Sequence, residues 1–332
     1  MVHYSVTRIA EKSNGTQKGM ALLVVLWVMA ILTIMVLSLS LLTRSNTFGA
    51  FVFKKGLEEQ FLAEAGIERG ITEMAYYLVN ASQVPMFEDK KSWKFDGTLH
   101  SGRLANGVYE IRIQDESGKI ALNGLSDASG IVLKNLLLRL KSTPEEADTI
   151  VDSILDWKDP DDLHRLNGAE NDYYQSLTKP YPCKDGTFES LEELLLVKGI
   201  TPEILYGTGE RKGLIQFLTL HNRFNRINLN VAPRELLAAL PGVSDVMADN
   251  IVDFRLSTEI KRISDITGIV GNALTMITPY ASGQPGPPVV CMIETKGYRT
   301  SERQGYTIQS TVKMDNPEKF QYVYYKSPAG NL

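Results

Sequence analysis

The sequence predicts an α+β fold, in which one long N-terminal helix packs on an antiparallel sheet and a large helical insertion interrupts the sheet. Three observations predict this fold. An uncharged apolar run continues without proline into an amphipathic segment, strand-like alternation occurs on both sides of the middle of the chain, and the middle itself has helical patterns. The 332 residues suggest about two domains. A net charge of −4 argues against a generally basic nucleic-acid binder.

The apolar run covers residues 20–42, where 23 consecutive residues carry no charge. A helix of that length is about 34 Å long, enough to cross the hydrocarbon core of a bilayer. The run is too long for an ordinary cleaved signal peptide. It is therefore predicted to be a transmembrane segment, either a plain single-pass anchor or one that is processed at its start.

Residues 43–80 are predicted to extend the same helix beyond the membrane. Phe53, Leu57 and Phe61 recur every four residues, and apolar residues continue this stripe. Gly66 and Gly70 form a G-x-x-x-G pattern that permits close packing of the helix. The stripe needs a partner surface, and the chain's own sheet is the expected one.

Residues 81–123 and 283–332 are predicted to form this sheet. Residues 107–115 alternate as a half-buried strand, and residues 120–123 are expected to be its hairpin partner across a turn at 116–119. Three further strands are predicted at 289–298, 304–314 and 321–326. A stretch rich in glycine and proline at 283–288 marks the return to the sheet.

Residues 124–282 are predicted to be an all-α insertion. Thr143, Pro144 and Glu146 make a strong helix start with a capping box. Residues 230–255 have the pattern of a helix-hairpin-helix with Pro241 and Gly242 in its turn, a motif that can bind DNA phosphates through backbone amides. Residues 188–280 carry 9 Lys and Arg against 11 Asp and Glu, a net −2, so DNA binding is kept only as the alternative function.

An acidic cluster is the main candidate for a binding site. Residues 145–172 contain ten acids against Lys158 and Arg165, a net charge of −8. A loop rich in carboxylates and amides suits calcium, although the spacing is not that of an EF-hand, because Leu163 stands where a ligand should be. A solvated acidic face is the other interpretation. The candidate calcium ligands are Asp159, Asp161, Asp162, Asn167, Glu170 and Asp172.

The remaining reactive residues predict no catalysis. There is no P-loop, G-x-S-x-G or dinucleotide-binding motif, so the chain is not expected to be an enzyme. The two cysteines, Cys183 and Cys291, are a candidate disulfide if the soluble part lies in an oxidising compartment.

The junction before the apolar run resembles the leader of type IV pilin-like proteins. In that family a prepilin peptidase cuts after a glycine, which would be Gly19 here, and Met20 would become the methylated first residue of the mature chain. Most members carry a glutamate at the fifth mature position, where this chain has Val24. In this respect the chain resembles the minor pseudopilins of the K type (GspK) of the type II secretion system, which characteristically lack the glutamate. The resemblance extends to the segments MALLVVLWVMAILTIMVLSLS and FLAEAGIERGI.

This resemblance implies a pilin-like fold whose helical insertion contains SAM-like helix-hairpin-helix elements. It also implies a leader at residues 1–19, an inner-membrane anchor with a cytoplasmic N-terminus, and a periplasmic soluble domain that starts at residue 43. The expected function is a non-catalytic one at the tip of a pseudopilus, in protein export across the outer membrane. The implied partners are minor pseudopilins of the GspI and GspJ types and the prepilin peptidase, with calcium as cofactor and no nucleic acid.

Overall fold

The computed structural model describes residues 15–80, 93–209, 211–222, 225–283, 289–300 and 304–329. The chain divides into two compact units, residues 1–58 and 59–332, which are treated separately below. The helix α1 (Gly15–Asn80) contributes to both units. Three predicted segments lie wholly or largely outside the described residues: residues 1–14 of the leader, residues 81–92, and residues 284–288 of the stretch rich in glycine and proline.

The first unit presents an apolar helix with nothing around it. From Met20 onward every apolar side chain of the run is exposed, and an 18-residue window reaches a mean hydropathy of 2.9. The hydroxyl groups of Thr33 and Thr43 donate to backbone carbonyls one turn earlier, so these polar groups are satisfied within the helix. By length and composition, this is the one helix among the described residues that is able to cross a membrane.

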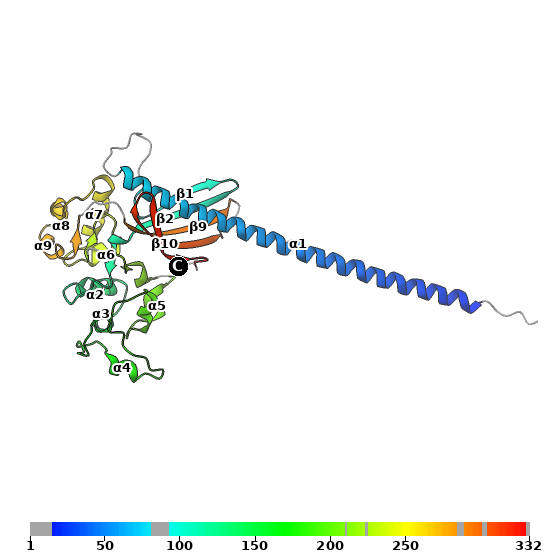
Figure 1. Ribbon diagram of the computed structural model, residues 1–332, viewed down its shortest axis with the longest axis horizontal. Helices are drawn as coiled ribbons and strands as arrows, with labels where there is room; N and C mark the ends of the chain where they lie inside the picture. The colour runs from blue at the N-terminus through cyan, green and yellow to red at the C-terminus, as the bar shows by residue number, and fades with distance from the viewer. Residues whose placement is uncertain are drawn as a thin grey trace, which may run out of the picture. The chain divides into compact units, whose positions relative to one another are not determined.

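In the second unit, residues 59–80 of α1 pack on a five-stranded antiparallel sheet (Figure 1). The strand order is β1-β2-β9-β10-β11, so strands from both ends of the chain meet where β2 pairs with β9. The predicted fold class is confirmed. The strand bounds are β1 (Asp96–Leu104), β2 (Gly107–Asp115), β9 (Val290–Arg299), β10 (Tyr306–Asn316) and β11 (Lys319–Lys326).

Only part of the predicted helical stripe is buried in this unit: Ile67 and Met74 are buried, whereas Phe61 is 60% exposed. Ala63, Ile67 and Met74 form one hydrophobic core with the inward-facing Ile111 and Ile293 of the sheet. A Cβ atom on Gly66 would lie 2.9 Å from Thr295 Cγ2, and one on Gly70 would lie 3.0 Å from Ile111 Cδ1. The two glycines therefore let the helix approach the sheet closely, as the G-x-x-x-G pattern indicated.

Two strand predictions were wrong. The strand β1, which pairs with β2, was not predicted, because its sequence DGTLHSGRL is polar and lacks a buried alternation. The predicted hairpin partner at 120–123 does not pair with β2. Instead β3 (Ile120–Ala121) pairs in parallel with β6 (Leu218–Thr219), and β9 takes the place beside β2.

The insertion is mostly helical but not all-α, which corrects the prediction. Besides β6, which pairs with β3, the insertion contains two short strand pairs, β4 with β5 and β7 with β8. Each of these strands is two residues long. Its strands have the bounds β4 (Gly207–Thr208), β5 (Arg211–Lys212), β7 (Ile227–Asn228) and β8 (Ala281–Ser282). Its α-helices are α2 (Gly130–Arg139), α3 (Pro144–Lys158), α4 (Asn171–Gln175), α5 (Pro202–Tyr206), α6 (Arg234–Ala239), α7 (Asp245–Ser257), α8 (Thr267–Val270) and α9 (Ala273–Ile277).

Three of the four 3-10 helices among the described residues lie in the insertion, the first lies just before it, and one large core completes the insertion. Short 3-10 helices occur at η1 (Glu116–Gly118), η2 (Glu192–Leu196), η3 (Leu214–Gln216) and η4 (Ile263–Ile266). The core includes Leu133, Leu136, Ile150, Ile154 and Phe217, and it is separate from the core under α1. The second unit thus contains two hydrophobic cores.

Buried polar contacts join the two cores at the end of β2. Gln114 donates to the Val231 carbonyl over 2.9 Å, and Asn228 donates to Ser117 Oγ over 3.1 Å. Beside them Lys119 Nζ lies 2.6 Å from Glu116 Oε1, with both side chains buried. Because leaving any of these groups unpaired costs more than the bond contributes, the network fixes how the sheet and the insertion join.

Candidate functional site

The helix α3 places the first acidic residues of the site. Its capping box forms as predicted: Thr143 accepts from the Glu146 backbone amide, and the Glu146 carboxylate accepts from the Thr143 amide. Its apolar face is buried in the larger core, and Trp157 donates from Nε1 to Glu193 Oε1 over 2.9 Å. The helix ends with Asp159 as its C-cap, at the start of the acidic loop.

Arg165 gathers three carboxylates at this end of α3. Its Nη1 lies 2.7 Å from Asp156 Oδ1 and 2.6 Å from Asp159 Oδ2, and its Nε lies 2.9 Å from Asp127 Oδ1. The Asp156 side chain is completely buried, and burial raises its pKa. A Cβ atom on Gly168 would overlap the Asp156 carboxylate, so the loop needs a residue without a side chain there.

Three of the six predicted calcium ligands converge. Asp159, Asp161 and Glu170 each offer a carboxylate oxygen within 4.8 Å of the others. Glu170 is only 1% exposed, and neither of its carboxylate oxygens has a hydrogen-bond partner. Asp159 Oδ1 is also buried without a partner. Burial, followed by the charges of Asp156 and Asp159, raises the pKa of Glu170 to about 7.

The other three predicted ligands do not join this group. The Asn167 side chain donates to Asp152 over 3.0 Å, and Asp172 accepts from the Tyr173 amide and lies 3.0 Å from His164 Nε2. Asp162 is exposed and contributes to no such cluster among the described residues. The chain path, which turns at Gly168 and begins α4 at Asn171, directs these side chains elsewhere.

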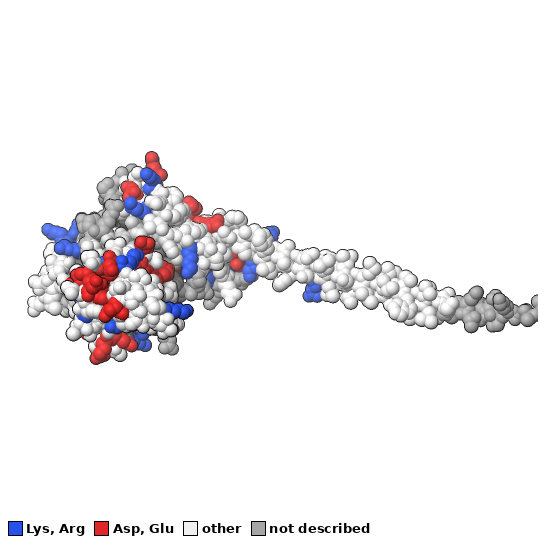
Figure 2. Space-filling view, turned by 60° about the horizontal axis from the view of Figure 1, so that its bottom comes forward, with Lys and Arg blue, Asp and Glu red and all other residues white. Residues whose placement is uncertain are grey.

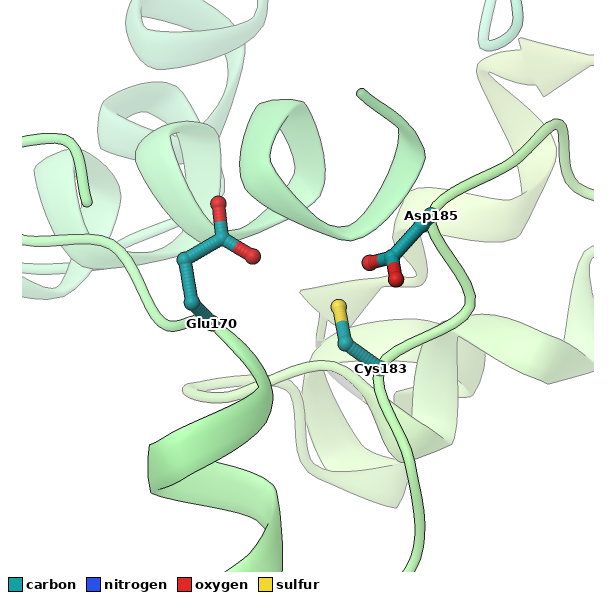
Figure 3. Close-up of side chains that lie close together, drawn as sticks. All are labelled: Glu170, Cys183 and Asp185. Atoms are coloured by element: carbon teal, nitrogen blue, oxygen red, sulfur yellow. The ribbon is translucent and has the colours of Figure 1, made fainter. Parts of the chain in front are cut away.

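Sequence reasoning missed a second group that shares Glu170. Cys183 Sγ and a carboxylate oxygen of Asp185 lie within 4.8 Å of each other and of Glu170 (Figure 3). Cys183 is buried, and burial raises the pKa of its thiol to about 12. Both residues follow the acidic cluster in sequence by more than ten positions, so no local spacing signalled them.

The disulfide considered from the sequence is not formed. Cys183 and Cys291 are both free. Cys183 belongs to the core of the insertion, whereas Cys291 lies on β9 in the core under α1. Their positions in two separate cores explain why the pairing is absent from this structure.

The face around these residues carries a concentration of acids (Figure 2). Its exposed members include Asp161, Asp162 and Asp172. Arg165 compensates the charge of the buried Asp156, whereas neither carboxylate oxygen of Glu170 has a hydrogen-bond partner among the described residues. Buried carboxylates without a partner are costly, and a divalent cation is a group that would satisfy them.

The residues singled out for processing and assembly lie on α1. Met20 and Val24 are 68% and 61% exposed on the uncovered part of the helix, and the backbone of Gly19 is helical. Nothing in the geometry of these residues reports on cleavage.

The helix-hairpin-helix pattern is present as α6, a turn and α7. Gly242 in the turn has a φ of 79°, which explains the glycine. Arg234, the first residue of α6, forms ion pairs with two acids of α7: its guanidinium lies 2.5 Å from Asp249 Oδ1 and 3.2 Å from Asp245 Oδ1. These two aspartates on α7 neutralise the charge of Arg234, and they would repel the phosphate backbone of DNA.

The fold and the site together define a class: a protein with a pilin-like fold, an N-terminal helix long and apolar enough to cross a membrane, and a large inserted domain. A family model described as "Type II secretion system (T2SS), protein K" matches residues 118–207, the segment that contains both carboxylate groups. The type II secretion system protein K of Pseudomonas aeruginosa is 27% identical over 256 residues, which cover 72% of each chain.

Two further comparisons agree. A putative type II secretion system protein K of Escherichia coli K12 is 27% identical over 206 residues, 58% of this chain and 60% of that protein. The solved complex of GspK, GspI and GspJ from enterotoxigenic Escherichia coli has a chain with a TM-score of 0.58 at 14% identity, covering 86% of this chain and all of the other, which is a likeness of fold. In sequence, the chain is thus similar to type II secretion system proteins K, most specifically over residues 118–207.

Proposed function

We propose that the protein is the minor pseudopilin that occupies the tip of a type II secretion pseudopilus and supports protein export across the outer membrane. The observation that carries this proposal is the apolar helix at 20–42 joined to a sheet that a large insertion interrupts. The helix would assemble by packing against other pilin-like helices. The insertion would leave no room for a further subunit above it.

The details at the N-terminus belong to the same proposal. The leader 1–19 stays in the cytoplasm, the prepilin peptidase cuts after Gly19, and the soluble unit lies in the periplasm. Val24 stands where most pilin-like proteins carry a glutamate that pairs with the terminal amine of the subunit ahead. A carboxylate within a bilayer is costly without such a partner, so valine suits a subunit that has none ahead of it.

The partners follow from the solved relative. That structure is a complex of GspK with GspI and GspJ. We propose that this chain binds the corresponding minor pseudopilins of its own system, and that it acts by assembly and without catalysis.

The experiment is affinity purification of the tagged full-length chain from membranes of a strain with an intact secretion system. The proposal expects minor pseudopilins of the I and J types in the eluate, and loss of secretion when the gene is deleted. A Val24→Glu variant should insert normally but recruit fewer tip partners or secrete less, whereas a Val25→Ala control should not. Normal secretion by the deletion strain would contradict the proposed role.

We also propose that calcium binds at Asp159, Asp161 and Glu170. Calcium takes oxygen ligands, and the three carboxylates fit it because Glu170 is buried with both oxygens unpartnered. Bound calcium would supply the positive charge that these carboxylates lack. The chain's own role is to hold the end of α3 and the start of α4 at one place, which Arg165 and Gly168 do through Asp156.

Thermal unfolding of the detergent-solubilised protein with calcium or with a calcium chelator tests this. A ligand present at about 100 times its Kd stabilises the folded state by about 2.7 kcal/mol. Wild type should therefore gain Tm with millimolar calcium. Asp161→Asn should lose the gain, whereas Asp172→Asn, in the same loop but outside the group, should keep it. Equal calcium responses in both variants would contradict this ligand set.

DNA binding by the helix-hairpin-helix is the alternative function. The pairing of Arg234 with Asp245 and Asp249 argues against it. A gel shift with duplex DNA at several salt concentrations separates the two functions, since tight and salt-sensitive binding would favour the alternative.

A further inference from the structure

Glu170, Cys183 and Asp185 form a mixed group of ligand atoms that the proposed calcium site does not explain. Their side chains point toward one common space (Figure 3), and one ligand atom from each lies within 4.8 Å of the others. Glu170 comes from the N-cap of α4, and the other two come from the loop that follows that helix. The Cys183 amide donates to Asn171 Oδ1 over 3.2 Å, which holds the loop against the start of α4.

The buried Glu170 carboxylate points into this group without any hydrogen-bond partner. The residue is 1% exposed, and both of its oxygens are unsatisfied. The neighbouring cations are directed elsewhere: Lys184 lies 2.8 Å from Glu193 Oε2, and Lys198 donates to the carbonyls of Asn167 and Gly168. Because a buried carboxylate without a compensating group is costly, this arrangement indicates a binding site for a cation.

The sulfur atom decides which ion fits. Calcium is a hard cation that takes oxygen ligands, so a thiol gives it nothing. Zinc binds cysteine sulfur and carboxylate oxygen in tetrahedral sites, and many of its sites use three protein ligands with a fourth, open position. One thiol and two carboxylates within 4.8 Å of one another satisfy that requirement. The open position would face the solvent near the exposed Asp185.

We propose that Glu170, Cys183 and Asp185 form a zinc site, adjacent to the oxygen-only group and sharing Glu170 with it. On binding, the Cys183 thiol releases its proton to solvent and a zinc–sulfur bond forms, with no change of oxidation state. Because Glu170 belongs to both groups, zinc bound here competes with calcium for that carboxylate. Zinc at this site therefore lowers the apparent affinity for calcium.

This inference does not depend on the proposed calcium site, because zinc binding is measurable in calcium-free protein. It is also independent of the role at the pseudopilus tip. The variants can separate the two metal proposals: Asp161 belongs only to the oxygen group, Cys183 and Asp185 only to the thiol group, and Glu170 to both.

The test is titration of the full-length, chelator-treated and reduced protein in detergent with Zn²⁺, followed by calorimetry. A parallel titration with Cd²⁺ reads the sulfur directly, because a cadmium–thiolate bond gives an ultraviolet charge-transfer band. The expected result is one zinc per chain and one thiolate band. In the presence of zinc, the calcium titration should shift to weaker binding.

The ligand variants then assign the band. Cys183→Ser and Asp185→Asn should each weaken zinc binding by at least about tenfold, since even supporting residues contribute 10–100-fold to metal affinity. Cys183→Ser should also abolish the cadmium band. Cys291→Ala is the matched control, because Cys291 is an equally buried thiol in the other core, and it should keep both. Asp161→Asn should keep zinc.

Circular dichroism of each variant shows whether it has folded, and Cys183→Ala replaces Cys183→Ser if serine is not tolerated. Zinc affinity that is unchanged in both Cys183 variants would overturn the proposal and would place the ion elsewhere, for example at His164 and Asp172, which lie 3.0 Å apart. Absence of a thiolate band in wild type would also overturn it. Loss of calcium binding alone would bear on the calcium proposal and leave this one standing.

Discussion

Thr295 on β9 donates from Oγ1 to the backbone carbonyl of Ala63 on α1 over 2.8 Å, across 232 residues of chain. The bond is buried and lies beside Gly66, whose missing side chain lets the helix reach the strand. The bond connects the long helix to β9, a strand that follows the whole insertion in the sequence. The two ends of the pilin-like unit therefore depend on each other for stability.

Substitution of Gly66 should test this contact. A side chain at Gly66 would meet Thr295 Cγ2 at 2.9 Å, whereas one at Gly56 would meet nothing within 4 Å. Gly66→Leu is expected to lower the free energy of unfolding by about 1–3 kcal/mol through overpacking. Gly56→Leu should be neutral or slightly stabilising, because leucine favours helix over glycine. Urea unfolding measures both, and equal effects would contradict the close packing.

Removal of the Arg165 guanidinium should destabilise the acidic loop strongly. Arg165→Met leaves the fully buried Asp156 carboxylate without its cation. Breaking a buried pair on one side typically costs about 3–5 kcal/mol. Adding Asp156→Asn to the same chain removes the unpaired charge and should restore much of that loss. A double variant that is no more stable than Arg165→Met would contradict the claim that the unpaired Asp156 charge causes the loss of stability.

The capping box of α3 should make a smaller contribution. Thr143→Ala removes the acceptor of the Glu146 amide, and loss of such a cap costs about 1 kcal/mol. Thr143→Ser keeps the hydroxyl oxygen and should stay close to wild type. The comparison is made by thermal unfolding, and a serine variant as unstable as the alanine variant would show that the methyl group rather than the hydroxyl matters.

Stability should depend on pH through Asp115, at the join of the two cores. Burial raises the pKa of this carboxyl from its ordinary 3.8 to about 6. Since the folded-state pKa lies above the unfolded value, the folded state holds the proton more tightly. The contribution of Asp115 to stability is fully present below pH 3.8 and is lost as pH rises through 6. At pH 5 it is worth about 1 kcal/mol more than at pH 7.

Asp115→Asn isolates this effect. Asparagine still offers Oδ1 to the Ser117 amide, which donates to Asp115 over 2.8 Å, but it carries no charge. Relative to wild type, the variant should therefore be more stable at pH 7 than at pH 5. Unfolding free energies at the two pH values give the difference, and a constant offset between the two proteins would exclude a titrating Asp115.

Local patterns in the sequence predicted much of the fold. The unbroken helical pattern of residues 43–80 and the alternation in β2, β9 and β10 are direct consequences of helix and strand periods, although Phe53 and Phe61 of the predicted stripe are exposed. The strand β1 was not predicted because a polar edge strand needs no buried face. The Asn106-Gly107 pair that follows it is nevertheless a hairpin signal. The predicted strand at 120–123 was given the wrong partner, because the true partner of β3 lies almost 100 residues away.

The candidate site could be predicted only in part. The surplus of acids identified the loop in which three of the six predicted ligands converge, because uncompensated charge is visible in the sequence. Which acids converge depends on how the chain turns at Gly168 and on where Cys183 and Asp185 return, which no local spacing encodes. The buried Arg165–Asp156 pair explains why some acids of the cluster are structural, while Glu170 is left without a partner.

The most direct test of the proposed pseudopilin role is the N-terminal residue of the protein extracted from the membrane of a cell with a prepilin peptidase. Mass spectrometry of the N-terminal peptide reads it. The account predicts a chain that begins at a methylated Met20, and a Gly19→Leu variant that keeps the leader. A wild-type chain that retains Met1 and its leader would contradict the account.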